Sequence, residues 1–531
     1  MPENIVLVGL PGSGKTRVAR ALAEATGLEM LDLDHEFHAI HGMSPADYIE
    51  KYGEPAFRER EATIAQAPRC GQIIATGGGA VIDPISRWHL WHSGLVVWLD
   101  ADDELLSERI AKGGHRPLSS DIGSLRARRD ERTPFYAAAD MRLDASLPLA
   151  DKVGAILAAA SQPLPRARTL YRAEVRRDHP MGPRTASIEI GHRLDAASLA
   201  ELVARHSTGE PIVIADRNVA EKQPHIVHAF ATSRLHSIDA GESNKRLRSA
   251  EAMLEFAAEH RAERGDAWVA IGGGTTGDLA GCAAALYVRG APLIQVPTTL
   301  LAMSDSAIGG KVGVDLASAK NAAGAFWPPV AVVSDVAALS TLSRDLLLDG
   351  LAECIKSALI GDAWLWRTIV ERGLDAVEGR DSAALYAIAE RSAALKLGVV
   401  DRDPFELGER KHLNLGHTIG HALEIESGYR LTHGQAVMFG LRAVAHIAVG
   451  RGILGPEIAT QIDELLGALG YDLHRSFDSG TVTTALTRDK KVSSGTITWI
   501  LPTGIGTVTQ ARDVTPEEIA AALAHIQQRE S

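Results

Sequence analysis

Cysteine is scarce in this chain, with only Cys70, Cys282 and Cys354 among 531 residues. Their odd number and wide spacing predict neither a disulfide framework nor a cysteine zinc cluster. A basic excess is also missing, because the formal net charge is −12, and this argues against a nucleic-acid partner. No apolar run reaches about 18 residues, so we expect no membrane span. The opening Met-Pro-Glu-Asn lacks the basic start and long apolar run of a secretory signal, and we expect a cytoplasmic enzyme.

The apolar runs that do occur divide the chain into an α/β part, a linker, a second α/β part and a mainly helical part. We expect these parts at 1–160, 161–185, 186–343 and 344–531. Strands expected at about 4–9, 72–76 and 95–99, with helices between them, predict a parallel sheet in the first part. The second part repeats the pattern, with strands at about 186–190, 211–215, 267–271, 293–296 and 330–334. Four prolines and six arginines in 161–185 indicate the linker.

A phosphate-binding loop follows the first expected strand, because residues 9–16 read Gly-Leu-Pro-Gly-Ser-Gly-Lys-Thr. The glycines let backbone N–H groups approach phosphate oxygens, and the N-terminus of the next helix adds a favourable dipole. Lys15 would reach the β- and γ-phosphates, and Thr16 would ligate Mg²⁺. The sequence therefore predicts phosphoryl transfer from ATP with Mg²⁺.

Four later features bear on the phosphoryl acceptor. Asp32 and Asp34 end the second strand, and Arg58 lies in an expected helix. Gly77-Gly-Gly79 ends another strand, and Arg116 and Arg132 come later. Each feature alone has a structural explanation, such as a strand-end cap or a surface arginine.

Taken in this order, residues 1–160 resemble shikimate kinase along their whole length. The resemblance implies an ATP site made by Gly12, Ser13, Gly14, Lys15, Thr16, Arg109 and Arg116, with Asp32 near the Mg²⁺ shell. It implies a shikimate site made by Asp34, Arg58, Gly78, Gly79 and Arg132, with Lys15, Asp34 and Arg116 catalytic. A gluconate or adenylate-type kinase is the alternative, but it would not need Asp34, Arg58 and Arg132 together.

A second group of polar residues has the spacing of a metal site. His417 and His421 are four residues apart and share one face if helical, so either can ligate a metal, and His433 lies 16 residues beyond His417. Glu353 and Lys356 are expected on the side of helix 344–360 opposite its buried face. Two histidines and a glutamate suit Zn²⁺ with an open position for a substrate oxygen.

The α/β part before this group carries signals for anions. The run Ile271-Gly-Gly-Gly-Thr-Thr-Gly277-Asp278 follows a strand and opens a helix, but it is only a weak sign of phosphate binding. Lys311, Lys320 and Asn321 flank a glycine turn and would form an anion cradle.

From about residue 185 to the end, the chain resembles 3-dehydroquinate synthase. The resemblance implies Zn²⁺, or Co²⁺ in its place, held by Glu353, His417 and His433. It implies NAD⁺ bound by Asp216, Asn218, Glu242, Lys245, Gly273, Gly274, Asp278, Thr298, Thr299 and Lys320. The heptulosonate phosphate would be bound by Arg289, Asp305, Lys311, Asn321, Lys356, Lys396, Arg410, Asn414, His421 and Lys491. Of these, Lys311, Lys356, Arg410, Asn414 and His421 would be catalytic, with His421 as a proton relay instead of a ligand. Arg289 would reach a neighbouring subunit, since the family commonly forms dimers.

These observations predict a fused enzyme of the shikimate pathway whose two steps are not consecutive. A sister sugar-phosphate cyclase with another carbocyclic product is the alternative for the second half. A metal-dependent alcohol dehydrogenase is a third alternative, but it would not need a phosphate clamp made by Lys311, Lys320, Asn321 and Lys491. A scaffold with decayed sites would have lost residues such as Lys15 or His417, and both are present.

Overall fold

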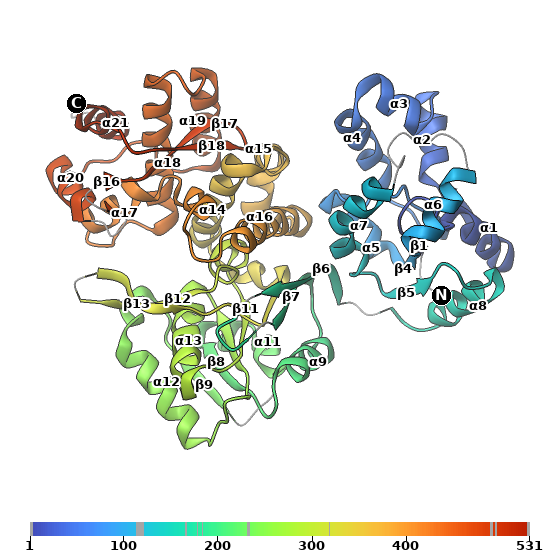
Figure 1. Ribbon diagram of the computed structural model, residues 1–531, viewed down its shortest axis with the longest axis horizontal. Helices are drawn as coiled ribbons and strands as arrows, with labels where there is room; N and C mark the ends of the chain where they lie inside the picture. Colours follow the sequence, from blue (N-terminus) through green and yellow to red (C-terminus); the bar gives the residue numbers. More distant parts are fainter. Residues whose placement is uncertain are drawn as a thin grey trace. The chain divides into compact units, whose positions relative to one another are not determined.

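The computed structural model describes residues 4–112, 122–164, 167–177, 179–182, 184–230, 234–317, 319–488, 492–493 and 496–527. The chain forms two compact units (Figure 1). The first unit holds residues 1–175 and 187–195, and the second holds 176–186 and 196–531. Within the described residues, no helix is long and apolar enough to cross a membrane.

The first unit is built on a parallel sheet with the strand order β2-β3-β1-β4-β5. Its strands are β1 (Asn4–Val8), β2 (Glu29–Asp32), β3 (Gln72–Ala75), β4 (Gly94–Asp100) and β5 (Met141–Asp144). The central strand β1 is buried along its whole length, as its Ile-Val-Leu-Val run requires. The helices are α1 (Lys15–Thr26), α2 (Leu33–His41), α3 (Pro45–Tyr52), α4 (Glu54–Ala65), α5 (Pro84–Ser93), α6 (Asp103–Lys112), α7 (Ile122–Tyr136) and α8 (Leu149–Ala160).

Part of the expected linker at 161–185 forms regular structure. Strand β6 runs from Arg168 to Arg177, and strand β7 runs from Arg184 to His192. Leu170, Tyr171 and Ala173 are buried, and so is Arg168, so this segment contributes to a core despite its arginines. Arg168 NH1 donates to Asp140 over 2.6 Å, and Arg87 Nε donates to the Leu170 carbonyl over 3.0 Å. The segment is therefore packed onto the first unit instead of crossing solvent.

The second unit begins with parallel strands in the order β14-β11-β10-β8-β9. They are β8 (Ile212–Asp216), β9 (Leu235–Ile238), β10 (Trp268–Gly272), β11 (Leu293–Pro297) and β14 (Ala331–Asp335). The chain order reverses between β8 and β10, and ligands of such sheets bind beyond the strand ends at this point. The other elements of this part are α9 (Ala196–His206), α10 (Arg217–Lys222), α11 (Pro224–His228), η1 (Glu242–Asn244), α12 (Leu247–Glu259), α13 (Gly274–Leu286), η2 (Tyr287–Arg289), η3 (Ala302–Ser306), the hairpin β12 (Lys311–Leu316) and β13 (Ala319–Phe326), and η4 (Val336–Thr341).

The rest of the second unit is mainly helical, as the sequence predicts. Its helices are α14 (Arg344–Gly361), α15 (Ala363–Val377), α16 (Ser382–Arg402), η5 (Glu409–Asn414), α17 (His417–Glu426), α18 (His433–Gly450), α19 (Pro456–Leu469), α20 (Ser479–Arg488) and α21 (Pro516–Ile526). Two small hairpins, β15 (Val492–Ser493) with β16 (Thr496–Ile497) and β17 (Trp499–Gly504) with β18 (Thr507–Ala511), complete it.

Helix α14 corrects one expectation, because it is buried on all sides around the site. Glu353 and Lys356, expected opposite the buried face, are 1% and 2% exposed. Helices α15, α16 and α18 surround α14, so both charged side chains lie in the interior and must be paired.

Candidate active sites

The phosphate loop of the first unit has the expected strand–loop–helix setting. Gly12 and Gly14 have φ angles of 86° and 92°, which glycine adopts without strain. Lys15 Nζ is buried and donates to the carbonyls of Gly9 and Leu10 over 2.7 and 3.0 Å. The loop therefore stabilises its lysine with its own backbone oxygens.

A metal-shell pair lies beside this loop. Thr16 Oγ1 donates to Asp32 Oδ2 over 2.7 Å, joining the start of α1 to the end of β2. The other oxygen of Asp32 caps α2 by accepting from the Asp34 and His35 amides. A hydroxyl and a carboxylate at a phosphate loop suit Mg²⁺, so the side chains fit the expected ion.

Arg58 faces the glycine run at the end of β3. A Cβ added at Gly79 would lie 2.3 Å from Arg58 NH1, so only glycine admits the guanidinium here. Arg58 is held by ion pairs to Glu54 over 2.7 Å and to the buried Glu61 over 2.5 Å. Burial raises the pKa of the Glu61 carboxyl, and the charge of Arg58 opposes that rise.

Arg132 reaches the same glycine run from α7. Its NH1 donates to the Gly78 carbonyl over 3.1 Å, and Tyr136 donates its hydroxyl to the same oxygen over 2.5 Å. Burial raises the pKa of Tyr136 to about 12, so the phenol stays protonated as a donor. Asp34 joins the group, since a Cβ at Gly77 would lie 3.1 Å from its Oδ1. The expected acceptor-site residues therefore converge on one place.

Arg109 and Arg116 are the remaining residues of the expected ATP site. Arg109 NH1 lies 3.4 Å from the Gly12 carbonyl, and its NH2 donates to the Ala145 carbonyl over 3.2 Å, beside the phosphate loop. Arg116 lies outside the described residues.

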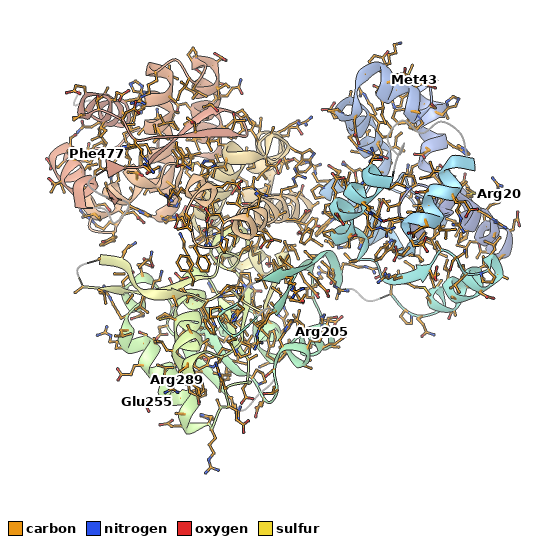
Figure 2. All side chains as sticks on the ribbon, in the orientation of Figure 1. Arg20, Met43, Arg205, Glu255, Arg289 and Phe477 are labelled. Atoms are coloured by element: carbon orange, nitrogen blue, oxygen red, sulfur yellow. The ribbon has the colours of Figure 1, made fainter. Side chains whose placement is uncertain are left out.

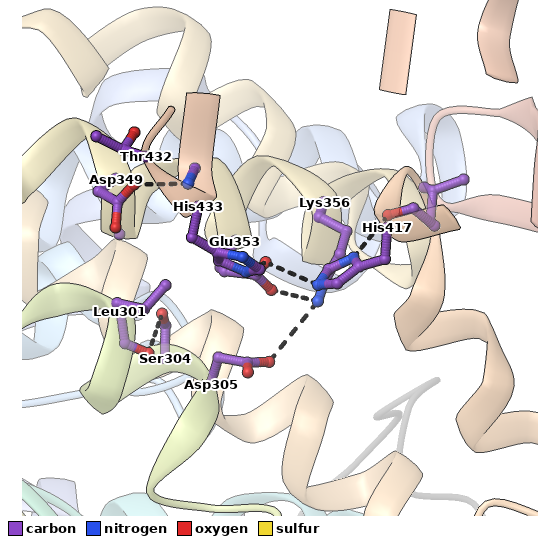
Figure 3. Close-up of polar contacts among 12 residues, drawn as sticks. Leu301, Ser304, Asp305, Asp349, Glu353, Lys356, His417, Thr432 and His433 are labelled. Carbon is purple, nitrogen blue, oxygen red and sulfur yellow. Dashed lines mark hydrogen bonds and ion pairs between the residues drawn. The ribbon is translucent and has the colours of Figure 1, made fainter. Parts of the chain in front are cut away.

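Glu353, His417 and His433 form the centre of the second site (Figure 3), with one possible ligand atom from each within 4.8 Å of the others. Glu353 Oε1 lies 3.4 Å from His417 Nε2 and 3.2 Å from His433 Nε2. The three residues come from the middle of α14 and the first residues of α17 and α18. Two imidazoles and a carboxylate that face one point suit Zn²⁺ with an open fourth position.

The electrostatics of this cluster are dominated by its carboxylates. Burial alone would raise the pKa of Glu353, but the charges of Lys356 and His433 hold it below its usual range. Burial would lower the pKa of His433, yet hydrogen bonds and charge from Glu353 and Glu424 raise it to about 10. The two carboxylates therefore favour the protonated form of His433.

Lys356 links the metal-type cluster to a second acidic group. Its Nζ is in contact with Glu353 and lies 3.7 Å from Asp305 Oδ1 (Figure 3). Lys396 Nζ lies 2.8 Å from the same Asp305 oxygen. The cluster thus places two amines and a carboxylate beside the expected position of the metal.

Arg410 and Asn414 form the next part of this site. Arg410 NH2 donates to the Gly309 carbonyl over 2.7 Å, and a Cβ at Gly309 would lie 2.9 Å from the same nitrogen. Asn414 Nδ2 donates to Glu406 Oε1 over 2.7 Å, and Lys311 pairs with the other oxygen of Glu406. Lys311 and Asn414 therefore meet at one glutamate, whereas Lys320 and Asn321, expected in the same anion cradle as Lys311, pair with Glu242 and Lys245 instead.

The expected NAD⁺ residues gather at the ends of β8 and β10. Asp216 ends β8, and Gly273 and Gly274 follow β10 at the point where the chain order reverses. A Cβ at Gly273 would lie 3.2 Å from Thr299 Cγ2, and one at Gly274 would lie 3.0 Å from Ser306 Oγ. The narrow turn leaves the backbone accessible to a phosphate, so it fits a dinucleotide.

An ion-pair network extends from this turn. Lys245 Nζ lies 2.5 Å from Asp278 and donates to Asn321 Oδ1 over 2.6 Å. Lys320 Nζ lies 3.0 Å from Glu242 Oε1. Two further expected residues lie at strand or helix ends, Thr298 buried after β11 and Asn218 in the first turn of α10, where Asp216 accepts from its backbone amide.

Arg289 and Lys491 are not brought into this group. Arg289 is exposed on a turn after α13 (Figure 2), with φ of 65° and Val288 before it at 47°. Such angles strain residues other than glycine, and a β-branched valine most of all. Lys491 lies outside the described residues.

The structure places in the two sites three carboxylates and one phenol that we did not predict from the sequence. They are Glu61, Tyr136, Glu406 and Glu424. Glu61 sits three residues after Arg58 and Glu424 seven after His417, so helical spacing was the signal available for both. Glu406 follows an irregular segment after α16, and no periodicity pointed to it.

Comparisons with known proteins match both units. Residues 11–157 match the family model of shikimate kinase. Residues 235–349 and 350–492 match those of the 3-dehydroquinate synthase N-terminal and C-terminal domains.

Individual relatives match the second unit. A 3-dehydroquinate synthase of Symbiobacterium thermophilum is 41% identical over 61% of this chain and 93% of its own length. A 2-epi-valiolone synthase of Actinosynnema mirum is 36% identical over 62% of this chain and 88% of its own. The structure of 2-epi-5-epi-valiolone synthase from Streptomyces hygroscopicus, with NAD⁺ and Zn²⁺ bound, covers 64% of this chain and 96% of its own at 28% identity and a TM-score of 0.60.

Proposed function

Because the chain belongs to the shikimate kinase family through its first unit and to the 3-dehydroquinate synthase family through its second, we propose that it catalyses both reactions. The first is transfer of the γ-phosphoryl group of ATP to the 3-hydroxyl of shikimate. The second converts 3-deoxy-D-arabino-heptulosonate 7-phosphate to 3-dehydroquinate with loss of phosphate. Each unit carries its own site, so the two reactions need no shared residue.

The meeting of Asp34, Arg58 and Arg132 at the glycine run supports the first activity. Two arginines that converge on one point suit a planar carboxylate, and Asp34 can accept a hydrogen bond from a substrate hydroxyl. Lys15 would leave its carbonyl partners for the phosphates, while Thr16 and Asp32 would hold Mg²⁺. Asp34→Asn tests this assignment: ATP turnover with shikimate should fall at least about a hundredfold. An unchanged rate would remove Asp34 from the mechanism.

The adjacency of Glu353, His417 and His433 to Lys356, Asp305 and Lys396 supports the second activity. When bound, a divalent metal supplies Lewis acidity at the substrate hydroxyl, and NAD⁺ accepts and later returns a hydride. Lys356 and Lys396 would hold the oxygens near the reacting carbon. Arg410 and Asn414 would bind the carboxylate, and Lys311 the phosphate. His421, whose ring centroid lies 5.2 Å from that of His417, would relay protons.

Product identity by NMR tests the second activity. Purified full-length protein is given the heptulosonate phosphate, NAD⁺ and Zn²⁺, with and without a chelator. We expect chelator-sensitive release of phosphate with dehydroquinate as the carbon product. Folded, metal-loaded protein that releases no phosphate would contradict the proposal.

A sister sugar-phosphate cyclase is the second candidate for this unit, because relatives of that activity match it over most of their length. Arg410 and Asn414 favour the carboxylate-bearing substrate, since a guanidinium and an amide are the groups that bind a carboxylate best. Heptulose phosphates without a carboxylate discriminate the two candidates. Turnover of these compounds, with none of the heptulosonate, would establish the sister activity.

We further propose a homodimer formed through the second unit, in which Arg289 reaches the partner's site. The strained turn that exposes Arg289 supports this arrangement. Light scattering of the full chain and of Arg289→Ala tests it. A monomeric wild type with full cyclase activity would contradict it.

A further inference from the structure

We propose that Glu424 is a positioning residue that orients the metal ligand His433 from outside the coordination sphere. The inference rests on the proposed metal site at Glu353, His417 and His433. Glu424 has no role among the site residues predicted from the sequence or in the proposed reaction.

His433 lies between two buried carboxylates, one at each ring nitrogen. Its Nε2 lies 3.2 Å from Glu353 Oε1, and its Nδ1 lies 3.5 Å from Glu424 Oε1. The Glu353 and Glu424 side chains are 1% and 5% exposed. A metal-ligating imidazole commonly gives its second ring N–H to a carboxylate or carbonyl, which fixes its tautomer and rotation.

His417 repeats this arrangement with a different partner. Its Nε2 lies 3.4 Å from the same Glu353 oxygen, and its Nδ1 lies 3.2 Å from the Leu415 carbonyl. Both imidazoles therefore turn Nε2 toward Glu353 and Nδ1 toward an outer oxygen. Glu424 takes for His433 the place that a backbone carbonyl takes for His417.

Glu424 also joins the metal cluster to the NAD⁺ side of the site. The oxygen that faces His433 lies 3.6 Å from Lys320 Nζ, which itself pairs with Glu242 over 3.0 Å. Lys320 further lies 4.5 Å from the centre of the Tyr429 ring. A carboxylate in this position is charge-compensated by Lys320, so it stays available to the imidazole in the interior.

A rival arrangement makes Glu424 a ligand. His421, Glu424 and His433 also bring one possible ligand atom each within 4.8 Å of the others. That group would use Nδ1 of His433 and would leave Glu353 and His417 without a metal. The two arrangements predict opposite effects for removal of His417 and His421.

The test is metal affinity, read without turnover. Full-length protein is stripped of metal and titrated with Co²⁺, whose visible spectrum reports coordination. We expect Glu424→Gln to weaken Co²⁺ binding about 10–100-fold while keeping the shape of the spectrum, because Glu353, His417 and His433 still ligate the metal. Glu426→Gln is the matched control: it lies two residues on in α17, accepts from the Asp478 amide, and should bind Co²⁺ like the wild type.

The other outcomes are distinguishable. If Glu424→Gln binds Co²⁺ as tightly as the wild type, the inference is overturned. It is also overturned if His421→Ala loses Co²⁺ binding while His417→Ala keeps it. A wild type that binds no Co²⁺ would instead overturn the proposed metal site itself. If Glu424→Gln does not fold, as judged by circular dichroism, Glu424→Asp carries the same comparison, with a loss expected because the shorter side chain withdraws the carboxylate from Nδ1.

Discussion

The buried side chain of His179, outside the two sites, is held by one polar partner at each ring nitrogen. Its Nδ1 accepts from the Met181 amide over 3.0 Å, and its Nε2 lies 3.0 Å from the Pro328 carbonyl, to which it donates. These bonds fix the neutral ring, because a proton on Nδ1 would face the Met181 N–H.

His179 therefore predicts a pH dependence of stability. Burial and the charge of Arg184 lower its pKa to about 4, below the value near 6.5 of an unfolded chain. The unfolded state then binds more protons, so this contribution is complete above pH about 6.5 and is lost as pH falls toward 4. We expect a loss on the order of 2 kcal/mol in the free energy of unfolding of the second unit.

The comparison of wild type with His179→Gln, by denaturant unfolding between pH 7 and 4, checks this expectation. Glutamine keeps an amide donor toward Pro328 but does not titrate. Its curve should be flatter than that of the wild type. Parallel curves would assign the acid sensitivity to other groups.

At the scale of elements, three glycines bring the proposed metal ligands together. Gly416 precedes α17 with φ of 76°, and Gly440 of α18 packs against it so closely that a Cβ would lie 1.8 Å from its carbonyl oxygen. A Cβ at Gly434 would lie 2.6 Å from the backbone of Asp349 on α14. The backbones of α17, α18 and α14 therefore lie in contact near His417, His433 and Glu353.

Gly440→Ala should separate α17 from α18 and displace His417. We expect a destabilisation of about 1–3 kcal/mol and a clear loss of metal affinity. Gly450→Ala at the end of the same helix is the control, because its Cβ meets nothing within 4 Å and alanine favours the helix. Thermal unfolding and Co²⁺ titration of both variants measure the effect, and equal behaviour of the two would contradict this packing argument.

The segment of β6 and β7 makes another prediction at this scale. A fragment of residues 1–160 would leave the buried Arg87 guanidinium without the Leu170 carbonyl and Asp140 without Arg168. We expect this fragment to be at least about 2 kcal/mol less stable than a fragment of residues 1–195, since unpaired buried charges are costly. Urea unfolding of both fragments, followed by circular dichroism, checks the difference, and equal midpoints would contradict it.

The same elements show how far the sequence could predict the fold. The phosphate loop was predictable because its strand, glycines and helix are contiguous. Strand β6 was not, because its arginines and the prolines on either side of it suggested a solvent-exposed linker, and the burial of Leu170 depends on packing that no local pattern records.

The sites were predictable to a similar degree. The proposed ligands Glu353, His417 and His433 stand in recognisable motifs, whereas Glu406 and Glu424 contact the site only through residues distant in sequence. The burial of Glu353 and Lys356 was not predictable either. It arises because α15, α16 and α18 cover α14, and the periodicity of α14 alone does not record these neighbours.

For the whole molecule, the two sites share no described residue, and this predicts independent activities. Lys15→Ala should lower kinase turnover at least about a thousandfold and leave cyclisation within twofold of the wild type. Glu353→Gln should have the reverse effect, because it weakens the proposed metal site alone. Both activities are measured on each variant, and a joint loss in either would mean that the units are coupled.

Lys15, folded onto the carbonyls of Gly9 and Leu10, has a consequence for inhibitor discovery. A neutral acceptor offered to this ammonium only exchanges one set of oxygens for another, so it gains almost no affinity. An anionic group also gains a charge–charge attraction to the ammonium, which the neutral carbonyls do not offer. Compounds screened against the proposed ATP site should therefore be ranked by the formal charge that they place at the loop.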